Sequence, residues 1–140
     1  MFIVDYPSLW RRCGAVFYDS LLAISVMIIG TTVLLLTTKG QAIPANTLYY
    51  QIFLLLLLAA FWIGFWCYGG QTAGMAAWRI KLVTAEYHPV GWLQASLRFC
   101  LAIINIACLG IGFLWAIWDS ERQTLYDRLT RTKLILLPKK

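Results

Sequence analysis

The sequence predicts an all-α integral membrane protein with two full transmembrane helices and a third, broken apolar segment. Hydrophobic residues make up 61% of the 140 residues and charged residues only 13%, which is too apolar for a soluble domain of this size. Three apolar runs stand out, at residues 13–36, 48–68 and 99–118. No polar stretch is long enough for a second domain, so we expect a single domain over residues 1–140.

The first two runs are predicted to cross the membrane. Each approaches or exceeds the roughly 20 helical residues needed to cross a hydrocarbon core of about 30 Å. The polar segment between them, TTKGQAIPANT, contains Gly40 and Pro44 and is expected to turn the chain, which makes the two helices antiparallel. Residues 1–12 lack the pattern of a cleaved signal peptide, so we expect the first run to remain in the membrane.

The third run, FCLAIINIACLGIGFLWAIW, is long enough to span but contains Asn105, Gly110 and Gly112. Two short half-helices hinged near Gly110 would keep every Lys and Arg except Lys39 on one side of the membrane, as the positive-inside rule favours. Such a re-entrant hairpin is tolerated only where protein or a wet cavity satisfies its broken backbone. The alternative is a conventional third transmembrane helix, which places Arg122 and the later basic residues on the opposite side.

Two segments change to a strand-like pattern: RIKLVTAEYHPV after the second run, and TKLILLPKK at the end. We expect them to pair as a small cytoplasmic ribbon, which requires both to lie on one side of the membrane and agrees with the hairpin. Between them, GWLQASLR is expected to form a short amphipathic helix at the interface. Ala60 and Gly64 form a small-xxx-small pair that allows close helix packing, within one protomer or between two.

Asp19 is a carboxylate inside the first apolar run, where an ionisable side chain costs about 2.5 kcal/mol or more. Arg12 lies on the same helical face but about 10 Å away along the axis, too far for an easy direct contact. We therefore expect water, or Arg98 or Arg122 from a later segment, to satisfy the carboxylate. The functional interpretation is a cation or proton site in a hydrated pocket, and the structural interpretation is a pin that fixes helix packing.

A second charged cluster follows the third run directly and contains Asp119, Arg122, Asp127 and Arg128, with Gln123 among them. Asp119 is expected to cap a helix that begins there. We expect the carboxylates of this cluster to converge with that of the first run near one membrane face. Grouped carboxylates and arginines suit an ion relay, whereas the structural interpretation is a solvated interface network.

The glycine-rich segment GGQTAG contains Gly70, Thr72 and Gly74. Backbone amides exposed to an anion are its functional interpretation, and a tight cytoplasmic turn is its structural one. His88 has no second ligand at metal spacing and the cysteines lack a CxxC motif, so no metal or other cofactor is expected. The basic residues flank apolar runs, which favours the lipid bilayer as their partner and excludes nucleic acid.

Three pieces of the chain resemble the RDD family of membrane proteins, named for an arginine and two aspartates. In RRCGAVFYD, residues Arg12, Ala15 and Asp19 fit the family's opening pattern. GQTAG followed by RIKLV is similar to its glycine-rich turn and basic strand, and DSERQTLYDRLTRT to its closing segment. The chain departs from the family's usual basic residue, histidine and glycine at Met75, Tyr126 and Arg131.

The resemblance covers nearly the whole chain and implies one RDD-like transmembrane domain in a bacterial inner membrane, of unsettled function that is often suggested to be transport. With the positive-inside bias it implies a multi-pass protein with cytoplasmic N- and C-termini. No nucleophile, base and orienting group recur at usable spacing, so an enzyme is not expected. Two hypotheses remain. One is ion or small-solute transport by a homo-oligomer; the other is a non-transporting structural or accessory subunit whose charges lock helix packing beside another membrane protein.

Overall fold

The computed structural model describes residues 5–138, and its two longest elements are the predicted membrane spans. Helix α1 runs over Leu9–Thr37 and helix α2 over Leu48–Tyr68. At 1.5 Å per residue they are about 43 and 31 Å long, so each can cross a core of about 30 Å. Only 6% and 0% of their most apolar windows are buried inside the protein. Both predicted spans are confirmed, and their exposed apolar surface is suited to lipid.

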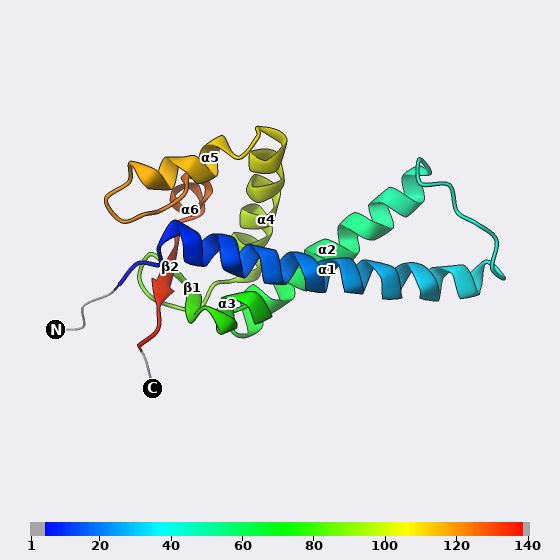
Figure 1. Ribbon diagram of the computed structural model, residues 1–140, viewed down its shortest axis with the longest axis horizontal. Coiled ribbons are helices and arrows are strands. Elements are labelled where there is room, and N and C mark those ends of the chain that lie inside the picture. The colour runs from blue at the N-terminus through cyan, green and yellow to red at the C-terminus, as the bar shows by residue number, and fades with distance from the viewer. Residues whose placement is uncertain (1–4, 139–140) are drawn as a thin grey trace.

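The third apolar segment is broken, as predicted. Helix α4 (Trp92–Ala107) is followed by a short helix α5 (Ile111–Leu114) and a 3-10 turn η1 (Trp115–Ile117), and the two arms are bent by 105°. The arms therefore form an open corner instead of a closed hairpin. Figure 1 shows α4 lying across the direction of α1. The helix predicted for GWLQASLR is present, but it is not a short helix of its own, because this segment forms the first turns of α4.

Local interactions hold this corner. Gly110 has a φ of 75°, a left-handed conformation that glycine adopts without strain. The chain bends at this residue. Across the bend, the amide of Phe113 donates to Oδ1 of Asn105 at 3.2 Å. The polar side chain near the hinge thus satisfies one of the backbone groups that the break releases, as a broken helix in an apolar environment requires.

The predicted ribbon is confirmed as an antiparallel pair of strands, β1 (Ile80–Thr84) and β2 (Thr132–Leu136), with Leu82 opposite Leu134. Strand β1 follows α2, whereas β2 follows the bent segment. A full third span would place the two strands on opposite sides of the membrane, where they could not pair. The pairing therefore requires both ends of the bent segment to lie on one side, and the conventional third helix is not formed.

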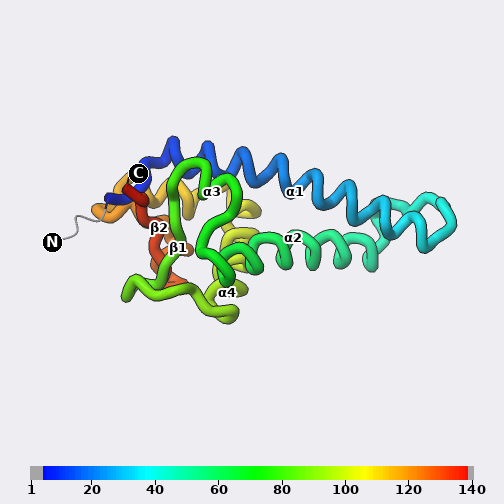
Figure 2. The backbone as a smooth tube through the Cα atoms, turned by 90° about the horizontal axis from the view of Figure 1, so that it is seen from below, coloured from blue at the N-terminus to red at the C-terminus, as the bar shows by residue number. Residues whose placement is uncertain are grey.

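The sheet, the short helices α3 (Ala73–Ala77) and α6 (Leu125–Leu129) and the first turns of α1 gather at one end of the molecule (Figures 1 and 2). We call this end the sheet side, and the opposite end, with the turn at residues 38–47, the turn side. The hydrophobic core also lies on the sheet side and comprises Ala15, Trp66, Met75, Ile80, Leu82, Val90, Ala95, Phe99 and Leu134.

Candidate functional site

Asp127 is the most enclosed charged residue of the sheet side, with an exposed fraction of 0%. It is placed by the first turn of α6, which begins with a capping box. The amide of Asp127 donates to Oγ1 of Thr124 at 3.3 Å, and the amide of Thr124 donates to Oδ2 of Asp127 at 2.9 Å. The sequence TLYD carries this motif, because a threonine followed three residues later by an acid satisfies two free amides at a helix start.

Two buried arginines converge on this carboxylate. Arg12, from the start of α1, places Nη1 3.0 Å from Oδ2 of Asp127. Arg98, from α4, donates through Nη1 to Oδ1 of Asp127 and, at 2.9 Å, to Oγ1 of Thr132. We call Arg12, Arg98 and Asp127 the arginine–aspartate junction. It ties α1, α4 and α6 together and carries one more positive than negative charge.

Aromatic rings enclose the guanidinium of Arg98. Its Cζ atom lies 5.3 Å from the ring centroid of Trp66 and 5.0 Å from that of Tyr126. Both distances are within the range in which a ring face attracts a cation. Tyr126 is the residue that replaces the family's usual histidine, and here its ring covers the junction. This position therefore contributes to packing around the arginine, which the sequence reasoning did not predict.

Asp127 is ionised at neutral pH. Its burial alone would raise the pKa, but the nearby charges of Arg98 and Arg12 and the amide of Thr124 outweigh that effect and lower the pKa below its ordinary value of 3.8. An anion with two cationic partners is the stable state of the junction. Its stabilising contribution is present above the ordinary pKa and is lost as the pH falls through the lowered one.

Within residues 5–138, Asp19 has no arginine partner, and the prediction that Arg98 or Arg122 would bind it is wrong. Its carboxylate accepts hydrogen bonds from Oγ1 of Thr72 and, at 2.9 Å, from the amide of Gly74, while only 3% of the residue is exposed. Arg98 is instead engaged with Asp127, and Arg122 is exposed in a loop. The glycine-rich turn thus supplies the partners that we expected from a later segment.

The close approach of α1 and α3 depends on Gly74. A Cβ atom at this position would lie 2.3 Å from the carbonyl oxygen of Ala15 and 2.9 Å from the Asp19 carboxylate. Thr72 caps α3, because its Oγ1 accepts the amide of Met75 at 3.2 Å while donating to the aspartate. The opening motif and the glycine-rich turn therefore meet in one contact. The turn packs against α1 and also binds the carboxylate of Asp19.

Gly70 forms the turn that precedes this contact. Its φ is 67°, and a Cβ there would lie 2.7 Å from the carbonyl oxygen of Leu82. The amide of Leu82 in turn donates to the carbonyl of Gly70 at 2.7 Å. This close backbone contact joins the glycine-rich turn to β1. GGQTAG therefore forms the tight turn of its structural interpretation.

Asp19 lies near the sheet-side boundary of the membrane span. It precedes Thr37, the end of α1 on the turn side, by five helical turns or about 27 Å, which is nearly the whole thickness of a hydrocarbon core. Its partner Thr72 follows closely on the sheet-side end of α2 at Tyr68. These helix lengths favour a position of the carboxylate near the sheet-side end of the span, and not at the middle of the bilayer.

Asp119 does not cap a helix as predicted. It closes a turn, in which one carboxylate oxygen accepts the amides of Glu121 and Gln123 at 3.2 and 2.9 Å. The other oxygen accepts Nε of Arg128 at 2.9 Å. These hydrogen bonds and the charge of Arg128 overcome the effect of burial and lower the pKa of Asp119. Helix α6 begins later, at Leu125, because Thr124 is its cap.

The three candidate carboxylates have separate partners. Asp19 binds α3, Asp127 binds two arginines and Asp119 binds Arg128. Across residues 5–138, no three acidic, histidine or cysteine side chains come close enough to hold a metal ion. Gln123 is buried, and its Nε2 donates to Glu121 at 2.7 Å. The candidate residues therefore divide into two buried centres, at Asp19 and at Asp127, with the Asp119 turn beside the second.

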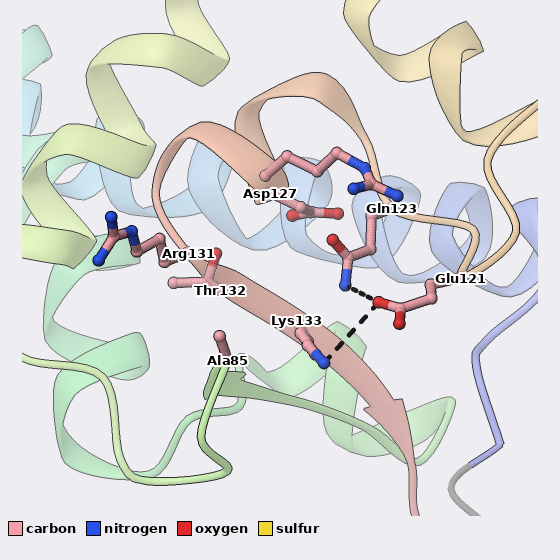
Figure 3. A pocket seen from close by; sticks show the side chains of 8 residues that line it. Ala85, Glu121, Gln123, Asp127, Arg131, Thr132 and Lys133 are labelled. Carbon is pink, nitrogen blue, oxygen red and sulfur yellow. Dashed lines mark hydrogen bonds and ion pairs between the residues drawn. The ribbon is translucent and has the colours of Figure 1, made fainter.

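A polar hollow opens next to the arginine–aspartate junction (Figure 3). Its volume is about 240 Å³, and it lies between the end of β1, the 119–123 turn, α6 and β2. The charged and polar side chains that line it include Glu121, Gln123, Asp127, Arg128, Arg131, Thr132 and Lys133. Sequence reasoning missed this hollow, because its walls come from segments that only the sheet pairing brings together.

Fold and site define a class: a small membrane protein in which two spans are joined on one side by buried ionic and hydrogen-bonded contacts between distant segments. The chain belongs to the RDD family, whose sequence profile matches residues 6–131. The resemblance of the three motifs is thereby confirmed.

Among curated proteins, the chain is similar to a proline-rich antigen of Mycobacterium leprae, with 29% identity over 90 residues that cover 54% of this chain and 36% of that protein. It is also similar to a proline-rich antigen homolog of Mycobacterium tuberculosis (strain CDC 1551 / Oshkosh), with 30% identity over 74 residues that cover 48% of this chain and 31% of that protein. The chain thus spans about a third of the length of these relatives. No solved structure matches it.

Proposed function

We propose that this protein is a multi-pass protein of a bacterial inner membrane that moves a proton or small cation, with Asp19 as the ionisable group. The observation that carries the proposal is the set of partners of Asp19. Within residues 5–138, no Lys or Arg nitrogen lies within 4.0 Å of its carboxylate, and its hydrogen bonds come from a hydroxyl and an amide, both neutral.

A buried carboxylate with neutral partners attracts positive charge. The free energy of removing an ion from water is large, so such a group takes up a proton or a cation unless a partner compensates it. Arg12 lies on the same helical face but is engaged with Asp127. The position of Asp19 near the sheet-side end of the span suits a first binding site, at which an ion leaves water before it crosses.

In this proposal the arginine–aspartate junction fixes the sheet-side end of α1. It fixes the start of α1 to α4 and α6, and so positions Asp19 relative to the sheet side. Two full spans are too few to enclose a pathway comfortably, so the proposal includes a homo-oligomer. No catalytic role is proposed.

Asp19→Asn is expected to abolish flux while the protein still accumulates in the membrane, because asparagine keeps the size of the side chain and removes its charge. Proton, sodium and potassium flux is measured in reconstituted vesicles, and protein level in the membrane by immunoblot. Asp119→Asn is the matched control, since it removes a sheet-side carboxylate outside the span and should leave flux unchanged. Absence of flux in the parent protein, or equal loss in both variants, would reject transport.

The second candidate is a structural or accessory subunit without transport, which has another membrane protein as its partner. The junction favours it, because two buried arginines on one aspartate serve to lock three segments together. In that case Asp19→Asn would lower the amount of protein in the membrane, and the parent protein would carry no current or flux.

We further propose that the sheet side is cytoplasmic, since among the basic residues within 5–138 Lys39 alone lies on the turn side. A reporter active only in the periplasm is expected to stay silent when fused after the C-terminus and to become active when inserted in the turn at residues 38–47. Cell extracts probed for both fusions control for expression. Strong activity of the C-terminal fusion would contradict this orientation.

A further inference from the structure

The polar hollow beside the junction has a positive surplus among its lining charges. Arg128, Arg131 and Lys133 contribute the cations, and Glu121 and Asp127 the carboxylates. In Figure 3 Glu121 lies beside Lys133, and Arg131 lies apart from both, with its side chain extending away from them.

Arg128 is already paired with Asp119, which lies outside the lining, but the two lining carboxylates do not balance the other two cations. Asp127 is already bound by the two buried arginines of the junction, whose two positive charges exceed its single negative charge. Glu121 holds Lys133 only loosely, at 3.7 Å. Within residues 5–138, no carboxylate lies within ion-pairing distance of the exposed side chain of Arg131. Within residues 5–138, Arg131 therefore has no counter-charge, and Lys133 has a single distant one together with the ring of Tyr87 at 5.2 Å, so both remain available to an added anion.

The two buried arginines of the junction give a second reason to expect an anion here, because some of their donors have no partner. Arg12 and Arg98 are exposed by only 3% and 4%, yet Nε and Nη2 of Arg12 and Nε of Arg98 have no hydrogen-bond acceptor among the described residues. Buried charges without enough counter-charge favour an anion nearby, because the field is weakly screened in a protein interior. Asp127, which these arginines share, is one of the residues that line the hollow.

We propose that this hollow binds a phosphate group, either as the free anion or on the headgroup of an anionic lipid. A guanidinium and an ammonium are the side chains that bind phosphate oxygens best. A volume of about 240 Å³ accommodates a phosphate together with several waters, each of which takes about 30 Å³. The sheet side is also where the other basic residues gather, within reach of lipid headgroups. This site is independent of whether Asp19 conducts an ion.

Arg131 provides a sharp test, because its φ is 51°, a left-handed conformation that glycine adopts more easily. Arg131→Gly therefore removes the charge without harming the fold, and its thermal midpoint should equal or exceed that of the parent protein. Lys133→Gln removes the second cation. Lys39→Gln is the matched control, since it removes a cation from the turn side.

Binding of the two sources is measured on purified protein. Inorganic phosphate is titrated by phosphorus NMR in nanodiscs of phosphatidylcholine, and retained phosphatidylglycerol is counted by native mass spectrometry of protein released from mixed nanodiscs. We expect Arg131→Gly and Lys133→Gln to weaken binding of one of the two probes about tenfold or more, and Lys39→Gln to leave it unchanged. Loss of lipid retention alone assigns the site to a headgroup, and loss of phosphate binding to the free anion. Equal binding by all variants, or no saturable binding by the parent protein, would overturn the proposal.

Discussion

Asp127→Asn is expected to destabilise the protein by about 3–5 kcal/mol, the range found when one partner of a buried ion pair is removed. The side chain has no exposed surface, and both of its oxygens are bound to arginines. Asparagine would leave Arg12 and Arg98 buried with two positive charges and no anion between them. It would also replace a carboxylate oxygen that accepts the Thr124 amide in the capping box.

The loss is measured as the change in the thermal midpoint in detergent and as protein level in the membrane. Asp119→Asn is the comparison, because the arginine partner of Asp119, Arg128, has a side chain that is 48% exposed, so this variant leaves no buried cation without an anion. Acid titration adds a second readout. Since the pKa of Asp127 is lowered in the folded protein, the parent should lose stability as the pH falls below about 4, and the variant should lose less. Equal midpoints for the two variants would refute the central role of Asp127.

The large loss of stability expected for Asp127→Asn follows from the way in which the membrane segments are held together. The spans bury little of their surface within the protein, so packing between them cannot supply much specificity. On the sheet side, by contrast, the junction joins α1, α4 and α6, and the contact of Asp19 with Thr72 and Gly74 joins α1 to α3. Directional polar contacts therefore determine which segments meet, and lipid accommodates the rest.

Sequence reasoning predicted the elements well, because each depends on local pattern. Hydropathy and length were sufficient for α1 and α2, and the alternation in RIKLV and TKLIL for β1 and β2. Gly110 and Asn105 marked the break in the third segment, since glycine allows the positive φ of the bend and the amide side chain spans it.

The partners of the charged residues were harder to predict. On one helix, spacing places Arg12 and Asp19 on a common face, but it does not say which other segment reaches each of them. Arg12 binds Asp127, 115 positions away, whereas Asp19 binds the turn after α2. One signal was available: the capping-box pattern at Thr124 could have placed the start of α6 and shown that the Asp127 carboxylate binds the amide of Thr124.

The contact between α1 and α3 leads to the second large expected effect. Gly74→Ala should destabilise the protein by about 3 kcal/mol or more, because the added methyl group would collide with the backbone of α1 and with a carboxylate held by hydrogen bonds. The nearest atoms to its Cβ would be the carbonyl oxygen of Ala15, at 2.3 Å, and the Asp19 carboxylate, at 2.9 Å. Moving α3 away to relieve the collision would also break the hydrogen bonds of Asp19 with Thr72 and Gly74, each of which costs about 1–3 kcal/mol when a buried group is left unsatisfied.

Gly64→Ala is the matched control in the neighbouring span. A Cβ there meets nothing within 4 Å, and alanine has the higher helix propensity, so this variant should be neutral or more stable by up to about 1 kcal/mol. Thermal midpoints in detergent and protease resistance of the sheet side distinguish the two. Should Gly74→Ala behave like Gly64→Ala, α3 would not lie against α1 in the membrane, and the burial of Asp19 would have to arise in another way. A loss confined to Gly74→Ala would establish that the glycine is required because a carboxylate and a helix backbone occupy the space of its missing side chain.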